Sequence, residues 1–203
     1  DAFAQGYAAL QRGEPALAAV QRVRLHDVQA RAASQPGYTQ PGTVDALAKA
    51  LDAAIAFQAG RSDDALALVT EANRIEDALP VEFGPPIIVK PTWELRGEML
   101  LAMNRPREAQ AAFARSLAMQ PGRLLSLEGL VVAARAAGDM EVATRAEGQL
   151  PPGVRQGGVP VIDVGGELVL RDDRSLVDVT ALHGLERVGG SLTIRHNLSL
   201  SSV

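Results

Sequence analysis

The sequence contains no cysteine among its 203 residues, which excludes disulfide bridges and thiolate metal ligands. Aromatic residues are also scarce, at 3% of the chain, and only two basic residues are lysines, Lys49 and Lys90. No apolar run approaches the roughly 18 to 20 residues that a membrane-spanning helix needs. The formal net charge of −4 lacks the basic excess expected of a nucleic-acid-binding protein. What is present is 47% hydrophobic residues, enough for one or two packed domains.

Sequence motifs of catalysis are absent as well. The three histidines, His26, His183 and His196, are too far apart in sequence to form an HExxH-type zinc site. There is no GxxxxGK[ST] motif, no GxSxG motif and no GxGxxG motif after a strand. Asp172 and Asp173 are two acids in one turn, against the roughly six to eight oxygens of a calcium site. The sequence therefore predicts a protein that is not an enzyme and binds no cofactor or metal, with His26 as a surface or capping residue.

A spacing that occurs four times predicts helical hairpins. Each copy has Gly or Asn at the end of an apolar helical pattern and Ala five residues later. Gly and Asn adopt the left-handed conformation that ends a helix at little cost, and alanine lets the next helix cross closely. The caps and alanines are Gly13/Ala18, Gly60/Ala65, Asn104/Ala109 and Gly138/Ala143, with Gly6, Ala53, Gly97 and Val131 seven residues before the caps. We therefore expect four antiparallel helix pairs in residues 1–150.

The third copy, "KPTWELRGEMLLAMNRPREAQAAFARSLAMQP" (residues 90–121), resembles the tetratricopeptide repeat (TPR) family. Five pattern positions match, Trp93, Gly97, Ala109, Phe113 and Pro121, while Arg96 and Ser116 depart from the pattern. We expect Trp93 and Phe113 to fill the space between helices and Pro121 to stop the second helix. The resemblance, which extends to bacterial TPR proteins without a defined activity, implies an irregular TPR-like helical-hairpin solenoid over residues 1–150. A generic helical bundle is the alternative.

The spacing between the caps is irregular. Successive caps are separated by 47, 44 and 34 residues, and only the last interval equals a standard repeat. The additional residues lie in two segments rich in Pro and Gly, 34–43 and 82–91. Insertions in solenoids form loops on one face, and long ordered loops are often functional. Both segments are therefore candidate binding loops.

A concave groove lined by the first helix of each pair is what the TPR resemblance implies. Carried over to this sequence, the groove residues are Phe57, Gln58, Glu94, Glu98, Leu101, Glu128, Val132 and Arg135. TPR proteins that clamp a terminal carboxylate place Lys, Asn and Arg there, whereas this groove has three glutamates. A mixed acidic and apolar groove favours a protein or peptide with basic and apolar side chains. The alternative for each glutamate is an ordinary solvated helix face.

A second repeat follows a linker. Residues 151–160, "PPGVRQGGVP", hold three Pro and three Gly without periodicity. Beyond them "GGELVLRDDRSLVDV" (165–179) and "GGSLTIRHNLSLSSV" (189–203) align at an offset of 24 with seven identities. Alternating apolar residues predict a short strand in each copy. The pattern resembles a receptor-L-domain-like, leucine-rich β-solenoid of bacterial surface proteins; a plain pair of β-hairpins is the alternative.

Residues 161–203 hold fewer repeats than a solenoid needs. Each coil buries its apolar face only against its neighbours, so roughly three or more repeats and a polar cap are required. This segment has one coil and most of a second. We therefore expect a mainly α chain that ends in a short, truncated β-solenoid segment and is a fragment of a longer protein.

Two functions follow as hypotheses. The first is a non-catalytic scaffold that binds a protein or peptide in the TPR groove, with no nucleic acid and no membrane-spanning segment. The alternative is a cell-surface receptor or adhesin whose ligand is bound by the β-solenoid, with the TPR part as a spacer. The resemblance to surface proteins favours an exported protein, periplasmic or at the cell surface.

Overall fold

A computed structural model describes residues 2–34, 41–80 and 88–151, and the backbone of four short strands after residue 162. The chain divides into two compact units, Asp1–Ala143 and Thr144–Val203. It is mainly helical, as expected. No helix in the described part of the chain is both long and apolar enough to cross a membrane.

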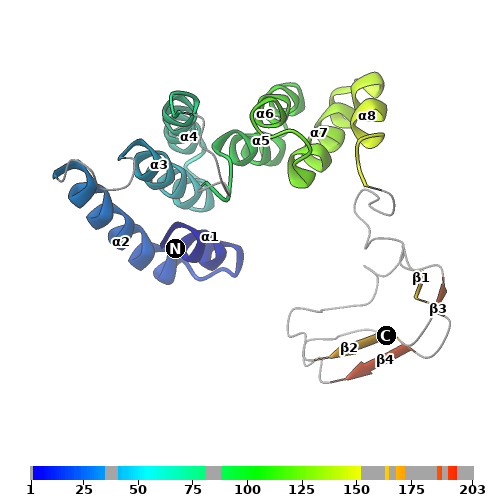
Figure 1. The fold of residues 1–203 in the computed structure, drawn as a ribbon, viewed down its shortest axis with the longest axis horizontal. Helices are drawn as coiled ribbons and strands as arrows, with labels where there is room; N and C mark the ends of the chain where they lie inside the picture. Colours follow the sequence, from blue (N-terminus) through cyan, green and yellow to red (C-terminus); the bar gives the residue numbers. More distant parts are fainter. Residues whose placement is uncertain are drawn as a thin grey trace. The chain divides into compact units, whose positions relative to one another are not determined.

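Eight helices account for most of the described residues (Figure 1). They are α1 (Ala2–Gln11), α2 (Pro15–Ser34), α3 (Pro41–Gln58), α4 (Ser62–Asp77), α5 (Thr92–Ala102), α6 (Pro106–Met119), α7 (Leu124–Ala137) and α8 (Met140–Glu147). From α1 to α7 each helix packs against the next one in the chain. In addition, α1 contacts α3, α3 contacts α5, and α5 contacts α7. The odd-numbered helices of the first unit therefore form a continuous row.

The four predicted helix caps are confirmed. The φ angles of Gly13, Gly60 and Gly138 are 71°, 75° and 81°, and Asn104, at 56°, is the one non-glycine residue with positive φ in the described ranges. In each turn the residue after the cap donates its backbone N–H to the carbonyl five positions earlier, at 2.8 to 3.0 Å. This bond defines a Schellman motif. The pairs are Glu14 with Ala9, Arg61 with Ala56, Arg105 with Leu100, and Asp139 with Ala134.

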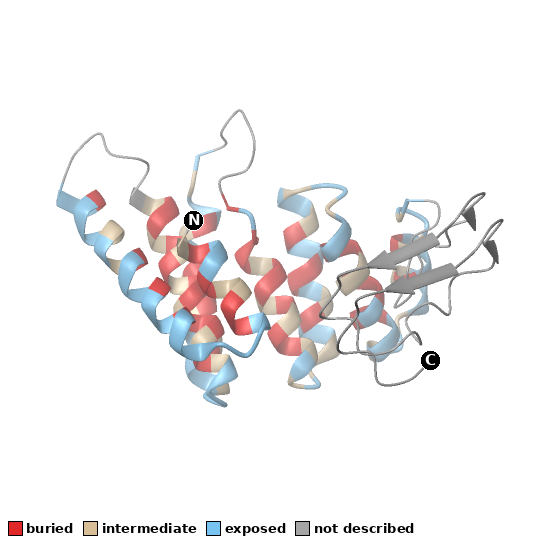
Figure 2. Cartoon of the chain, turned by 90° about the horizontal axis from the view of Figure 1, so that it is seen from below, coloured by how far each residue is buried: buried red, intermediate tan, exposed pale blue. Residues whose placement is uncertain are grey.

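The predicted small residues lie where helices approach closely. Ala18, Ala65, Ala109 and Ala143 are each 0% exposed. A Cβ on Gly97 would lie 2.7 Å from the ring of Phe113. In Figure 2 the buried residues, in red, form one side of most helices, and the opposite side is exposed. The close approach predicted from spacing is therefore confirmed.

The two aromatic residues of the third copy have different environments. Phe113 is 1% exposed and packs against Gly97 and Gly129, so it fills the space between helices as expected. Trp93 is only half-buried. Its indole Nε1 donates to Asp77 Oδ1 at 3.0 Å, and the guanidinium of Arg96 lies over its ring. Trp93 therefore contacts α4 but is not buried between the helices as Phe113 is, because its N–H finds its acceptor at the surface end of α4.

Two further expectations concern the end of a helix and the role of His26. Pro121 was expected to stop the second helix of the third copy, and α6 does end at Met119, two residues before it.

His26 was expected to be a surface or capping residue. It is partly exposed on α2, and its Nε2 lies 3.1 Å from Oδ2 of Asp52 on α3. Arg22 binds the other oxygen of Asp52 at 2.5 Å. His26 is therefore part of the contact between α2 and α3 in addition to being a surface residue.

In the second unit the structure describes the backbone of β1 (Asp163–Val164), β2 (Leu168–Arg171), β3 (Arg187–Val188) and β4 (Leu192–Arg195). Strand β1 pairs with β3, and β2 pairs with β4, both in parallel. Leu168 lies opposite Leu192, so the register equals the 24-residue offset of the sequence repeat. A hairpin would pair its strands antiparallel. Most of the predicted linker lies outside the described residues, as do Asp172, Asp173, His183 and His196.

Candidate functional site

The eight predicted groove residues all lie on odd-numbered helices. Helix α3 carries Phe57 and Gln58, α5 carries Glu94, Glu98 and Leu101, and α7 carries Glu128, Val132 and Arg135. Phe57, Gln58 and Glu98 line one cavity, whereas the other five do not. The structure therefore brings together three of the eight residues, from two helices.

The cavity has a volume of about 610 Å³ and lies between α1, α3 and α5. Its walls are mainly apolar and are formed by Leu10, Ala54, Phe57, Leu95, Met99 and Ala102. Volumes of this size and apolar walls are typical of sites that bind a small molecule or a side chain. The rim includes Gln58, whose Nε2 donates to the carbonyl of Leu10 at 2.8 Å and so links α3 to the end of α1.

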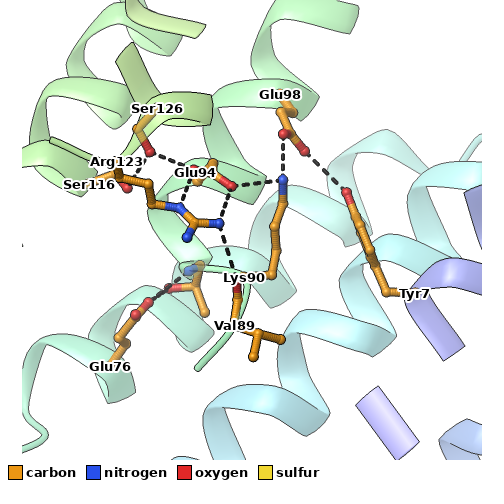
Figure 3. A network of polar contacts seen from close by, with 10 residues as sticks. Tyr7, Glu76, Val89, Lys90, Glu94, Glu98, Ser116, Arg123 and Ser126 are labelled. Atoms are coloured by element: carbon orange, nitrogen blue, oxygen red, sulfur yellow. Dashed lines mark hydrogen bonds and ion pairs between the residues drawn. The ribbon is translucent and has the colours of Figure 1, made fainter. Parts of the chain in front are cut away.

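The polar end of the cavity is formed by Tyr7, Lys90 and Glu98 (Figure 3). Tyr7 Oη donates to Glu98 Oε2 at 3.2 Å, and Lys90 Nζ lies 2.5 Å from Glu98 Oε1. The Lys90 ammonium also lies 5.5 Å from the centre of the Tyr7 ring. Burial, and then the charge of Glu98, raise the pKa of Tyr7, so its hydroxyl stays protonated. Because Lys90 neutralises Glu98, this end of the cavity carries no net charge.

Behind the polar end lies Glu94, which is 0% exposed. Arg123 binds it through two nitrogens, Nε to Oε2 at 2.6 Å and Nη2 to Oε1 at 2.9 Å. Ser126 Oγ donates to Oε2 at 2.6 Å, and Lys90 Nζ lies 3.0 Å from Oε1. Burial alone would raise the pKa of Glu94, but the hydrogen bonds from Arg123 and Ser126 and the charge of Lys90 outweigh it. The pKa of Glu94 therefore lies below its ordinary value, and the carboxylate is fully engaged inside the protein.

The network around Glu94 joins several parts of the chain. Arg123, which precedes α7, also donates from Nη2 to the carbonyl of Val89 at 3.1 Å. Ser126 on α7 lies 2.9 Å from Ser116 on α6, Oγ to Oγ. Lys90 bridges Glu94 and Glu98, one turn apart on α5. The network therefore fixes residues 88–90, α5 and α7 together and places Lys90 at the cavity.

A second buried carboxylate, that of Glu76 on α4, accepts hydrogen bonds from the first residue of α5. Its Oε2 accepts the backbone N–H of Thr92 at 2.8 Å and also the Thr92 hydroxyl. Asn73 Nδ2 donates to the same hydroxyl at 2.8 Å. Burial raises the pKa of Glu76 despite the hydrogen bonds from Thr92. Glu76 thus caps α5 from another helix, because α5 has no capping side chain of its own.

On α7 a separate surface combines exposed apolar side chains with the carboxylate of Glu128. Leu125 and Val132 are 52% and 47% exposed, and half-buried Glu128 lies between them in sequence. Spacings of three and four residues place these side chains on one helix face. Glu128 makes no ion pair with any residue that the structure describes. We call Leu125, Glu128 and Val132 the α7 stripe.

Several residues of the site were not predicted from the sequence. Tyr7, Leu95 and Met99 line the cavity, and Arg123 and Ser126 bind Glu94. For Lys90 the sequence indicated only that it belongs to the candidate binding loop 82–91. Of this loop the structure describes residues 88–91. Residues 82–87, and residues 35–40 of the other candidate loop, lie outside the described residues. Lys90 and Glu94 do stand four residues apart, but the Arg123 pairing crosses 29 residues and has no local signal.

The arrangement offers binding surfaces. Within the described ranges no group of three or more His, Asp or Glu side chains is placed to hold a metal ion. The buried polar groups of the network hold one another, and the cavity presents apolar walls with one neutral polar end.

No model of a known protein family matches the chain, and a search of curated proteins finds no match either.

Proposed function

We propose that this chain is a non-catalytic interaction scaffold, a TPR-like solenoid that binds a peptide segment of another protein along its odd-numbered helices. The single observation that carries the proposal is the apolar cavity of about 610 Å³ between α1, α3 and α5. It lies on the helices for which the TPR resemblance implies a groove. Three of the eight residues that the resemblance places there line it, Phe57, Gln58 and Glu98.

The chemistry of the row suits a peptide with apolar and basic side chains. Burying one large apolar side chain in the cavity would contribute about 1.5 to 3 kcal/mol. Glu128, which makes no ion pair within the described ranges, would attract a Lys or Arg side chain, while Leu125 and Val132 would contact its aliphatic part. Peptide binding thus combines an apolar anchor at α1, α3 and α5 with charge selection at α7.

The role of Glu94 in this proposal is structural. Its carboxylate is buried and bound by Arg123, Ser126 and Lys90, so it offers nothing to a ligand. By holding α5 and α7 in place before a ligand arrives, the network lowers the cost of ordering the binding face.

A second candidate is favoured by one specific observation, the parallel pairing of β2 with β4 at the repeat offset. Equivalent residues of successive coils pair in this way in a β-solenoid. In that case the chain belongs to a surface receptor or adhesin, the β coils bind the ligand, and the helices act as a spacer.

A selection of short random peptides displayed on phage, using the full chain as bait, tests the first proposal. The test variant is Glu98→Lys/Glu128→Lys, and the matched control is Glu71→Lys/Glu108→Lys, the same charge change on exposed positions of α4 and α6. Selected basic and apolar peptides should lose about tenfold or more in affinity for the test variant and keep it for the control. If no peptide is enriched, or if both variants bind equally, the proposal fails and the receptor candidate gains.

A further inference from the structure

We infer that the cavity between α1, α3 and α5 selects an aromatic side chain that carries a neutral hydrogen-bond donor, the phenol of tyrosine or the indole of tryptophan. This inference rests on the proposed function, because it names the side chain with which the bound peptide is anchored. Three properties of the cavity carry it: its walls, its charge and its hydrogen-bonding groups.

The walls suit a flat, large side chain. Phe57 offers an aromatic ring, and Met99 a polarisable thioether, to whatever occupies the cavity. Sulfur–aromatic and ring–ring contacts add to the stabilisation from buried area, and tyrosine, tryptophan and arginine are the residues most enriched as anchors at interfaces. A volume of about 610 Å³ accommodates either side chain.

The charge of the cavity disfavours ionised anchors. Lys90 and Glu98 already neutralise each other at 2.5 Å, and Glu94 is neutralised by Arg123 behind them. An arginine or lysine inserted here would meet the ammonium of Lys90, and a carboxylate would meet Glu98. Each would add an uncompensated charge to a partly desolvated site, which is costly.

The hydrogen-bonding groups at the polar end are mostly acceptors. The Glu98 carboxylate accepts from Tyr7 and Lys90, which leaves about two of its roughly four acceptor positions for a ligand. The Tyr7 oxygen donates its only proton to Glu98, so its lone pairs can also accept. Two of the three N–H groups of Lys90 are bound to Glu94 and Glu98, which leaves one donor. A phenol O–H or indole N–H satisfies these acceptors, whereas phenylalanine or leucine would desolvate them without a bond.

The test uses the full chain with its methionine methyl groups labelled with ¹³C. The chain has four methionines; Met99 lines the cavity, whereas the exposed Met119 and Met140 do not and report non-specific effects. The probes are the N-acetyl amides of tyrosine, tryptophan, phenylalanine, leucine and arginine. We expect tyrosine and tryptophan to shift the Met99 signal at concentrations about tenfold lower than phenylalanine and leucine, with arginine weaker still.

The variant Glu98→Leu removes the carboxylate acceptors, keeps the oxygen of Tyr7 and leaves Lys90 bound to Glu94. The preference for tyrosine over phenylalanine should then become clearly smaller, while Glu71→Leu on α4 should keep the full preference. Equal binding of phenylalanine by the original chain, tighter binding of arginine, or no Met99 shift with any probe would each overturn the inference. If one of these results is found and the peptide selection succeeds, the inference about the aromatic anchor fails and the proposed peptide-binding function stands. If the peptide selection itself fails, the proposed function fails.

Discussion

Two regions of the helical unit pack their odd-numbered helices by different means. Between α1 and α3 the interior is apolar and rich in alanine, with Leu51 and Ala53 both 0% exposed. Between α5 and α7 the same kind of contact contains the buried carboxylate of Glu94 with Arg123 and Lys90. Substitutions in the apolar contact should destabilise the protein according to how much buried apolar side chain they remove and how large a cavity they leave. The polar contact cannot lose one partner without leaving a buried charge unpaired.

Of these two contacts, the polar one should show the larger effect when one partner is removed. Glu94→Ala leaves Arg123 and Lys90 without their carboxylate, and should lower the free energy of unfolding by about 3 to 5 kcal/mol. Urea unfolding of the full chain, followed by circular dichroism at the helical band, measures the change.

Replacing the whole network sharpens that result. Lys90→Met/Glu94→Leu/Arg123→Met removes all three charges together and should cost far less than Glu94→Ala, because no unpaired charge remains. If the triple variant is less stable than Glu94→Ala, the network itself contributes most of the stability of this region.

The apolar region should show a somewhat smaller effect of a different kind. Leu51→Ala should cost about 2 to 5 kcal/mol through lost burial and the cavity that it leaves. Gly6→Ala should cost about 1 to 3 kcal/mol, because the new Cβ would lie 2.9 Å from Leu51 Cδ2. In the double variant the cost of Gly6→Ala should become clearly smaller, with a remainder from Gln21 Cβ, which the new Cβ would meet at 3.2 Å. Additive costs in urea unfolding would show that residues 6 and 51 do not compete for space.

The pH dependence of stability should isolate the contribution of Glu94 to the polar contact, with a smaller effect. The pKa of Glu94 is lowered by folding, so its stabilisation is present above the unfolded pKa, near 4.5, and is lost as pH falls through the folded value. The pKa of Glu76 is raised, so its contribution changes in the opposite direction. The original chain should therefore lose more stability on acidification than the triple variant, which keeps Glu76. Parallel acid dependences in urea titrations would contradict the assignment to Glu94.

The smallest expected effect concerns Trp93. Trp93→Phe removes the hydrogen bond to Asp77 at the surface and should cost about 0.5 to 1.5 kcal/mol. Phe113→Ala, in the core a short distance along the chain, should cost about 3 to 5 kcal/mol. A cost for Trp93→Phe as large as that for Phe113→Ala in thermal or urea unfolding would mean that Trp93 contributes more to stability than this surface hydrogen bond.

The comparison also explains what the sequence could predict. Gly13, Gly60, Asn104 and Gly138 were predicted as caps because a left-handed turn requires particular residues at one position. Glu94 occupies a position that the TPR resemblance assigns to a groove, yet Arg123, 29 residues later, covers it. That pairing depends on how α7 packs on α5, which no local spacing encodes. The cavity likewise needed Tyr7 of α1 beside Lys90 and Glu98, residues that meet only in the folded chain.

Photo-cross-linking tests the central claim, that peptides bind at the odd-numbered helices, most directly. A benzophenone amino acid would replace Phe57, which lines the cavity, or Val20, which is 48% exposed on α2. The selected peptides should cross-link to the full chain from the Phe57 position and not from the Val20 position. Cross-linking from Val20 alone, or equally from both positions, would contradict the account and place binding elsewhere on the chain.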